Sequence, residues 1–316
     1  MDTHCVRGAL FIPAVAALLS ATSYCAPPPA PTWPSAVARA AEFSPQARIV
    51  VLDIATGHLL ASSHLAEAGV TLAAPGSTLK PLVLYSLVES GRWDPSRRIA
   101  CSRKLVIAGR SLACSHPPAE PMDARQALAW SCNTYFAAVA GALAPGELRK
   151  LLAPTGLLSP PTFVPAQVTA VFRNPQTPDQ IRLTLLGVDG IAVTPLELAS
   201  AYRWLAIQMA AHPDSAATQV VQAGLQDSAS FGMAGAASLG GVPVAGKTGT
   251  ASPAAGAQNH GWFIGLAPSN LALSSSNSSK PPAVVIAVYL PAGRGADAAR
   301  VAAELLAHSP LQQAAP

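Results

Sequence analysis

The sequence contains few charged residues and few aromatic residues, and this scarcity limits the functions it can have. Of its 316 residues, 11% are charged and 5% are aromatic, and the net charge is only +4. The lysines and arginines form no run, which argues against nucleic-acid binding. The chain has no C-x-x-C pair, and its seven histidines are scattered singly, so we expect no metal site. Half of the residues are apolar, enough for a core of one large domain or two ordinary ones.

Residues 1–26 have the layout of a secretory signal peptide. Arg7 precedes an apolar run over residues 8–19, and small residues at 21–23 offer a cleavage site. The run is short for a membrane span, so an uncleaved anchor is the second interpretation, and Cys25 adds lipidation as a third. We therefore expect an exported protein, in the periplasm or on the outer face of the cytoplasmic membrane. Residues 27–44 follow as a proline-rich linker and residues 45–310 as one domain.

The stretch GSTLKP at residues 76–81 places a serine and a lysine where they can react together. Ser77 and Lys80 are three residues apart, so at the start of a helix they share one face. The amine of Lys80 can then take the proton of the Ser77 hydroxyl and make it a nucleophile. The residues that follow, to Glu89, are nearly all apolar, and Gly91 can end the run, which predicts a buried helix. By itself S-x-x-K is a common pattern.

Two further stretches complete a more specific signature. Residues 131–136 read SCNTYF and residues 247–251 read KTGTA. S-x-x-K, S-x-N and K-T-G in this order are typical of penicillin-binding proteins and serine β-lactamases. Two of only five lysines fall in these motifs, and TPLELA follows at residues 194–199. Together these stretches make residues 45–306 resemble the transpeptidase domain of penicillin-binding proteins.

The resemblance implies an α+β fold in which an antiparallel sheet, built from both ends of the domain, is packed by helices and carries a helical insert. The residue pattern agrees, because strand-like runs lie at both ends and helical runs lie between them. The strand-like runs cover residues 48–54, 58–62, 242–251, 261–266 and 283–289. The helical runs cover residues 122–130, 195–205 and 297–306, while residues 154–178 are irregular and residues 269–282 are a low-complexity connection.

The resemblance also implies a role for each motif residue. Ser77 attacks the peptide carbonyl of a D-alanyl-D-alanine stem, with Lys80 as the base. Ser131 relays the proton, and Asn133 orients the substrate amide. The backbone N–H groups of Ser77 and Thr250 form the oxyanion hole. The remaining motif binds the substrate carboxylate and consists of Lys247, Thr248, Gly249 and Thr250.

D-Alanine then leaves, and an amine from a neighbouring stem (transpeptidation) or water (carboxypeptidation) resolves the ester. The implied partners are peptidoglycan stem peptides and, as inhibitors, β-lactam antibiotics that acylate Ser77 and leave slowly. The chain has no room for a glycosyltransferase module, so a glycan-polymerising partner protein is a further expectation. No cofactor is implied.

Three other functions stay open at this stage. A β-lactamase of class A needs a carboxylate for deacylation, but no Asp or Glu occurs between Glu147 and Asp179, and Asn133 argues against class D. A non-catalytic β-lactam or muropeptide sensor keeps the same serine. Residues 241–248, GVPVAGKT, also fit the P-loop pattern of an NTPase. A P-loop needs a helix that starts at the Lys-Thr pair, whereas Gly249 and Pro253 follow here.

The cysteines in the middle of the chain allow two interpretations. Cys101 and Cys114 flank two short strand-like runs that turn at Ala108 and Gly109, which brings the two thiols close together. In an oxidising compartment they can form a disulfide, and otherwise they are two free thiols. Cys132, between Ser131 and Asn133, is interpreted as a buried core residue rather than as a nucleophile.

Overall fold

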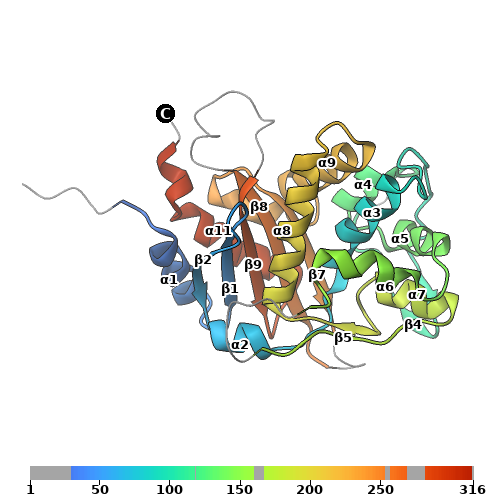
Figure 1. The fold of residues 1–316 in the computed structure, drawn as a ribbon, viewed down its shortest axis with the longest axis horizontal. Helices are drawn as coiled ribbons and strands as arrows, with labels where there is room; N and C mark the ends of the chain where they lie inside the picture. Colours follow the sequence, from blue (N-terminus) through green and yellow to red (C-terminus); the bar gives the residue numbers. More distant parts are fainter. Residues whose placement is uncertain (1–29, 118, 160–166, 253–256, 269–281, 315–316) are drawn as a thin grey trace, which may run out of the picture. The chain divides into compact units, whose positions relative to one another are not determined.

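A five-stranded antiparallel sheet organises the fold in the computed structural model, which describes residues 30–117, 119–159, 167–252, 257–268 and 282–314 (Figure 1). The strands follow the order β2-β1-β9-β8-β7 across the sheet. Two of them come from the start of the domain and three from its end, which confirms the predicted α+β class and the sheet built from both ends. Their bounds are β1 Arg48–Asp53, β2 Leu59–Ser63, β7 Ala245–Ala251, β8 His260–Pro268 and β9 Pro282–Leu290.

Alternating side chains on β1 enter two different cores, because the sheet is covered on both faces. Ile49 and Val51 belong to the core formed with α1 (Trp33–Phe43) and α11 (Gly295–Ala307). Val50 and Leu52 belong to the larger core formed with α8 (Pro195–Ala211) and the helices beyond it. In Figure 1, α8 crosses one face of the sheet, and α1 and α11 lie on the other. All these strand residues are fully buried. The sheet is therefore the middle layer of three, with helices packed on each of its faces.

Helix α1 corrects the predicted domain boundary. Thr32 caps the helix through a reciprocal pair of hydrogen bonds with Ser35, and the buried positions Ala36, Val37 and Ala40 lie on one face. That face packs against α11 and β2. The prediction of a linker over residues 27–44 was therefore wrong from Trp33 onward, because the proline-rich composition ends just before an amphipathic helix begins. Residues 1–26, with the predicted signal peptide, lie outside the described residues.

The chain between β2 and β7 forms the helical region that carries the rest of the larger core. Its α-helices are α2 Leu65–Val70, α3 Lys80–Glu89, α4 Ala124–Ala129, α5 Asn133–Val139, α6 Glu147–Leu152, α7 Pro178–Leu185, α8 and α9 Ala216–Ser230. Its 3-10 turns are η1 Gly76–Leu79, η2 Ala140–Ala142, η3 Ala153–Thr155 and η4 Gly235–Gly240, and η5 Pro310–Ala314 follows α11. β3 Val106–Ile107 and β4 Arg110–Ser111 form a short hairpin. β5 Val171–Phe172 also pairs with β6 Ile191–Ala192, although α7 lies between them in the chain. The predicted helices near residues 122–130, 195–205 and 297–306 are confirmed.

Helix α8 begins with a buried cap that ties it to the neighbouring chain. The carboxylate of Glu197 is fully buried and accepts hydrogen bonds from the backbone N–H groups of Thr194 and Ala170, at 2.8 and 2.6 Å. The Thr194 hydroxyl accepts from the Glu197 N–H at 3.1 Å, which completes the capping box. Burial raises the pKa of Glu197, and these hydrogen bonds oppose the rise. This carboxylate is therefore part of the scaffold.

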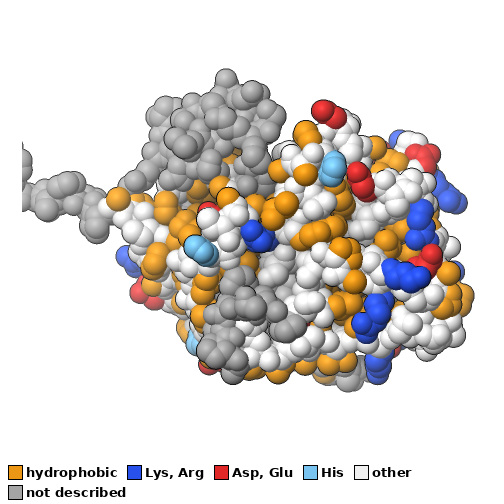
Figure 2. All heavy atoms as spheres, viewed as in Figure 1, with side chains coloured by type: hydrophobic (Ala, Val, Ile, Leu, Met, Phe, Trp, Pro, Cys, Tyr) orange, Lys and Arg blue, Asp and Glu red, His pale blue; other side chains and the backbone are white. Residues whose placement is uncertain are grey.

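Charged side chains are distributed unevenly over the surface. On the face drawn in Figure 2, most Lys and Arg side chains gather over the helical region around α6 and α7, with acidic side chains among them. Over the part of the chain that the structure describes, none of the helices combines the length and apolarity needed to cross a membrane. The predicted connection over residues 269–282 falls almost wholly outside the described residues.

Candidate active site

Ser77 and Lys80 lie at the junction of a 3-10 turn and an α-helix. Ser77 belongs to η1, and Lys80 is the first residue of α3, with its backbone N–H bonded to the Ser77 carbonyl. Side chains three residues apart eclipse each other in a 3-10 turn, so the turn aligns this pair more closely than an α-helix would. Pro81 occupies the first turn of α3, where the lost N–H costs nothing. Ser77 and Lys80 therefore lie at one helix start, and this local geometry is compatible with the predicted pairing.

The Lys80 amine is fully buried and surrounded by oxygen atoms of the S-x-N motif. Its Nζ donates to the Ser131 carbonyl at 2.8 Å, to the Ser131 hydroxyl at 3.2 Å and to Oδ1 of Asn133 at 2.7 Å. Nδ2 of Asn133 donates to the Leu112 carbonyl at 3.0 Å, which fixes the orientation of this amide. Burial lowers the pKa of Lys80 to about 7, while the thiols of Cys132 and Cys114 oppose the shift. A lysine in this state can accept a proton near neutral pH.

Ser131 has an unusual backbone conformation that presents its hydroxyl to both lysines. Its φ is +55°, in the left-handed region that glycine normally occupies after a helix. It follows α4, whose end is closed by the bond from the Cys132 N–H to the Ala127 carbonyl at 2.9 Å. A side chain held in this conformation costs on the order of 1–2 kcal/mol. A glycine would relieve this strain but would remove the hydroxyl that both lysines contact.

Lys247, on β7, also contacts Ser131. Its Nζ donates to the Ser131 hydroxyl at 2.8 Å and to the Thr248 carbonyl at 3.0 Å. Burial lowers the pKa of Lys247 well below its usual value, and the nearby charge of Lys80 lowers it further. The Ser131 hydroxyl thus lies between two amines, and a proton can pass through it from one side of the site to the other.

Two glycines allow the K-T-G strand to meet the serine turn, and a third contacts that turn from another segment. Gly76 has φ +57°, and a Cβ there would lie 2.9 Å from the Thr250 carbonyl oxygen and 3.0 Å from its backbone nitrogen. A Cβ on Gly249 would lie 2.5 Å from the Pro75 carbonyl oxygen. On the other side, the Gly76 N–H donates to the Gly187 carbonyl at 2.9 Å. The backbones of η1 and β7 are therefore in close contact, with Gly76 against Thr250 and Gly249 against Pro75.

The two threonine hydroxyls of β7 are already hydrogen bonded. Thr248 Oγ1 donates to the Met233 carbonyl at 3.3 Å, and Thr250 Oγ1 accepts from the Gly295 N–H at 2.9 Å. Thr248 is buried and Thr250 is exposed. β7 is one of the two edge strands of the sheet, and among the described residues no strand pairs with the side of its backbone away from β8. An edge of this kind can accept an extended peptide.

Several residues that hold the serine turn were not found from the sequence. His260 and Trp262, on β8, each bond the Ala74 carbonyl through Nε2 and Nε1 at 2.9 Å. Tyr202, on α8, donates its hydroxyl to the Thr78 carbonyl at 2.8 Å. All three side chains are buried. A buried polar aromatic needs a partner, but the sequence does not say which carbonyl will supply it.

The P-loop alternative is wrong. Lys247 and Thr248 lie within β7, paired with Ile264 and Phe263 of β8, and do not begin a helix. Without the helix start, the backbone N–H groups of this segment have no common direction in which to surround a phosphate. The residues that match the P-loop pattern therefore lead into an edge strand of the sheet instead of a phosphate-binding loop.

The cysteines of the middle segment lie together as free thiols. Cys101, Cys114 and Cys132 are unbonded, and Cys114 and Cys132 are 3.9 Å apart between sulfur atoms. Of the two interpretations left open for Cys101 and Cys114, the structure therefore has the free thiols. The expectation of no cysteine–histidine cluster was wrong, because His116 joins these three residues within 4.8 Å. Cys132 is fully buried, in line with its interpretation as a core residue.

Comparisons with known proteins extend this description. The model of the penicillin binding protein transpeptidase domain matches residues 47–306. No protein matches in a search of curated sequences. Among solved structures, the apo transpeptidase domain of penicillin-binding protein 3 from Burkholderia pseudomallei has a TM-score of 0.72 at 19% identity, over 88% of this chain and 95% of that chain.

Two other solved structures have the same fold. A peptidoglycan glycosyltransferase from Burkholderia ambifaria has a TM-score of 0.71 at 19% identity, over 86% of this chain and 92% of that chain. A structure of a peptidoglycan synthase complex has a TM-score of 0.68 at 22% identity, over 87% of this chain and 59% of that chain. The family match supports penicillin-binding and transpeptidase function in general. The chain belongs to the family of penicillin-binding protein transpeptidase domains.

Proposed function

We propose that the chain is an exported serine acyltransferase that acts on D-alanyl-D-alanine stem peptides of peptidoglycan as a transpeptidase or a D,D-carboxypeptidase. One observation carries the proposal. Ser131 accepts hydrogen bonds from both Lys80 and Lys247, and Lys80 stands one turn from Ser77. The lysines of the first and third motifs thus meet at the serine of the second, which supports Ser77 as the nucleophile, Lys80 as the base and Ser131 as the relay. A chance occurrence of the three patterns would not assemble them.

The acylation step uses the neutral amine of Lys80. This amine takes the proton of the Ser77 hydroxyl while the Ser77 oxygen bonds to the peptide carbonyl carbon. The carbonyl oxygen becomes an oxyanion, which accepts from the N–H groups of Ser77 and Thr250. The proton then passes through Ser131 to the leaving nitrogen, the peptide bond breaks, and D-alanine departs. Lys80 is neutral again at the end of the step.

In the proposed complex the substrate binds along the β7 edge of the sheet, where Thr250 is exposed. A peptide laid along β7 places its terminal carboxylate beside the Lys247 amine and the hydroxyls of Thr248 and Thr250. Asn133, whose Oδ1 accepts a hydrogen bond from Lys80, is proposed to bind the substrate amide. A carboxylate brought to this place also favours the charged form of Lys247, because an opposite charge offsets the cost of burial.

Resolution of the acyl-enzyme distinguishes the alternatives. A stem-peptide amine gives a crosslink, and water gives a shortened stem. The stretch between Glu147 and Asp179 has no acidic residue that could activate water, and the buried Glu197 is occupied by the cap of α8. A penicilloyl ester on Ser77 should therefore be long-lived, which favours a penicillin-binding enzyme over a β-lactamase.

Export and a glycan-polymerising partner complete the proposal. The sequence of residues 1–26 supports export, and stem peptides are found outside the cytoplasmic membrane. The fold likeness to a chain of a peptidoglycan synthase complex, of which this chain covers 59%, is compatible with a partner that supplies glycan strands.

The experiment follows D-alanine release from a synthetic stem pentapeptide, with and without an added amine acceptor. We expect release that requires Ser77, and a peptide–acceptor product if the enzyme is a transpeptidase. Ser77→Ala should abolish release. Ser86→Ala, in the following helix α3, should not, because the Ser86 hydroxyl donates to the Leu82 carbonyl within its own helix. Equal release by the wild type and Ser77→Ala would contradict the proposal.

A further inference from the structure

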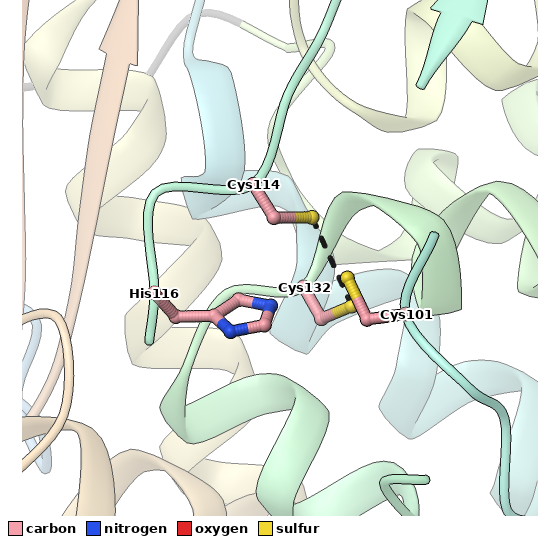
Figure 3. A group of neighbouring side chains, drawn as sticks. All are labelled: Cys101, Cys114, His116 and Cys132. Carbon is pink, nitrogen blue, oxygen red and sulfur yellow. Dashed lines mark hydrogen bonds between the residues drawn. The ribbon is translucent and has the colours of Figure 1, made fainter. Parts of the chain in front are cut away.

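Three cysteines and a histidine converge beside the S-x-N turn although they come from separate stretches of chain. Figure 3 shows Cys101, Cys114 and Cys132 with their sulfur atoms grouped and the His116 ring lying next to them. The three thiol sulfurs and a ring nitrogen all lie within 4.8 Å of one another. Cys114, His116 and Cys132 are buried, and Cys101 is half-buried. Four soft donors in so small a volume are what a tetrahedral metal ion needs.

The spacing of the sulfur atoms fits coordination to one ion. Zinc–sulfur bonds of about 2.3 Å in a tetrahedron place the sulfurs roughly 3.8 Å apart. Cys114 and Cys132 are 3.9 Å apart, a separation far longer than the ~2.0 Å of a covalent sulfur–sulfur bond. The site would thus need little movement of the backbone to bind the ion.

His116 supplies an independent observation that points to a ligand. Its side chain is only 1% exposed, and its buried Nε2 has no hydrogen-bond partner among the residues that the structure describes. Its Nδ1 lies 2.6 Å from the Pro117 carbonyl, an acceptor that fixes the proton on Nδ1 and leaves the Nε2 lone pair free. Metal-binding histidines are typically oriented in this way. A buried lone pair with no partner is costly unless something binds it.

We propose that Cys101, Cys114, His116 and Cys132 bind one zinc ion. Zinc suits this donor set because it favours tetrahedral sites of thiolate and imidazole ligands. All four positions are taken by protein side chains, so the ion is structural and has no open site for water. Binding forms three zinc–sulfur bonds and one zinc–nitrogen bond, and the displaced thiol protons go to solvent.

The surroundings are prepared for thiolate ligands. The backbone N–H of Asn133 donates to the sulfur of Cys114 at 3.2 Å, and the N–H of Arg103 donates to the sulfur of Cys101 at 3.3 Å. The Arg103 side chain donates to the His116 carbonyl at 2.6 Å, which brings a positive charge near the cluster. Three thiolates and a zinc ion carry a net charge of −1, so nearby donors and cations stabilise the complex.

The ion would join two parts of the chain at the catalytic turn. Cys132 stands between Ser131 and Asn133, while Cys101, Cys114 and His116 belong to the β3–β4 hairpin segment that precedes α4. The metal therefore links that segment to the S-x-N motif. The inference concerns binding and does not depend on the proposed function, since neither zinc content nor the ligand set changes if the enzyme acts on another acyl donor.

The test measures zinc in the full chain, made without a polyhistidine tag and purified with reductant. After gel filtration, elemental analysis should find one zinc ion per chain. Replacement by cobalt alone should give the intense sulfur-to-cobalt charge-transfer band and the visible bands of a tetrahedral site. Cys114→Ser and His116→Gln should each weaken zinc binding at least about 100-fold, more than the usual loss for an outer-shell change.

Matched controls separate the ligands from other cysteines and histidines. Cys25→Ser and His58→Gln should keep the full zinc content, since His58 is exposed and distant in sequence from the cluster. Circular dichroism identifies any variant that fails to fold. If a ligand variant does not fold, the proposal is judged from the cobalt spectrum of the wild type. A reduced, folded wild type that takes up neither zinc nor cobalt would overturn the proposal. So would a disulfide among Cys101, Cys114 and Cys132 in protein isolated from an exported fraction without reductant.

Discussion

The pH dependence of acylation is a quantitative consequence of the burial of Lys80. Its pKa is about 7, lowered by burial from 10.5, so the amine changes protonation within the ordinary working range. Acylation needs the neutral amine, and the neutral form grows as pH rises through this pKa. About a tenth of the enzyme has a neutral amine at pH near 6, and about nine tenths near pH 8. The rate of acylation should therefore rise roughly ninefold over this interval and then level off.

The assay is the second-order rate of covalent labelling by a fluorescent penicillin in buffers of constant ionic strength. Lys80→Arg keeps the charge but cannot supply a neutral base, so it should lose at least about 100-fold at every pH. Lys104→Arg, at an exposed position, should reproduce the wild-type profile. A rate that is flat or falls between pH values of about 6 and 8, or a Lys80→Arg variant with wild-type rate, would refute the assignment of Lys80 as the base.

Two further predictions concern the frame of the site. Gly187→Ala adds a Cβ 2.2 Å from the Gly76 carbonyl oxygen, whereas Gly91 has the same φ of +69° and nothing within 4 Å. Thermal unfolding should show a larger loss for Gly187→Ala than the ~1 kcal/mol expected for Gly91→Ala, and equal losses would contradict the close approach. Thr194→Ala removes the side-chain N-cap of α8, whose hydroxyl accepts from the Glu197 N–H. The free energy of unfolding, measured with denaturant, should fall by about 1–2 kcal/mol. An unchanged denaturation midpoint would show that the cap is dispensable.

The parts that the sequence predicted well depend on local chemistry. Ser77 and Lys80 share one helix start because they are three residues apart. The apolar runs at residues 48–54 and 283–289 alternate between two cores because a strand has two faces. The start of α8 follows from Thr194 and Glu197, whose spacing is that of a capping box. Each of these features is determined by residues a few positions apart, or by a need to bury apolar side chains that any apolar surface can meet.

The parts that the sequence did not predict depend on contacts between distant segments. The spacing of Cys101, Cys114 and Cys132 along the sequence matches no metal-binding motif. Their sulfur atoms come together only where the hairpin segment packs against the S-x-N turn. The role of Gly187 appears only when its backbone crosses that of Gly76. Helix α1 was missed because the prolines before it suggested a linker. It packs against α11, which lies near the other end of the sequence. Such contacts are set by topology rather than by residue pattern.

The most direct measurement of the central claim is the intact mass of the full chain after incubation with penicillin, followed over hours. The proposed chemistry predicts an adduct of one penicilloyl group that persists, that maps to the peptide containing Ser77, and that is absent in Ser77→Ala. The long life follows from the acid-free stretch between Glu147 and Asp179. No adduct on folded protein, or an adduct that remains in Ser77→Ala, would contradict the claim that Ser77 is the nucleophile.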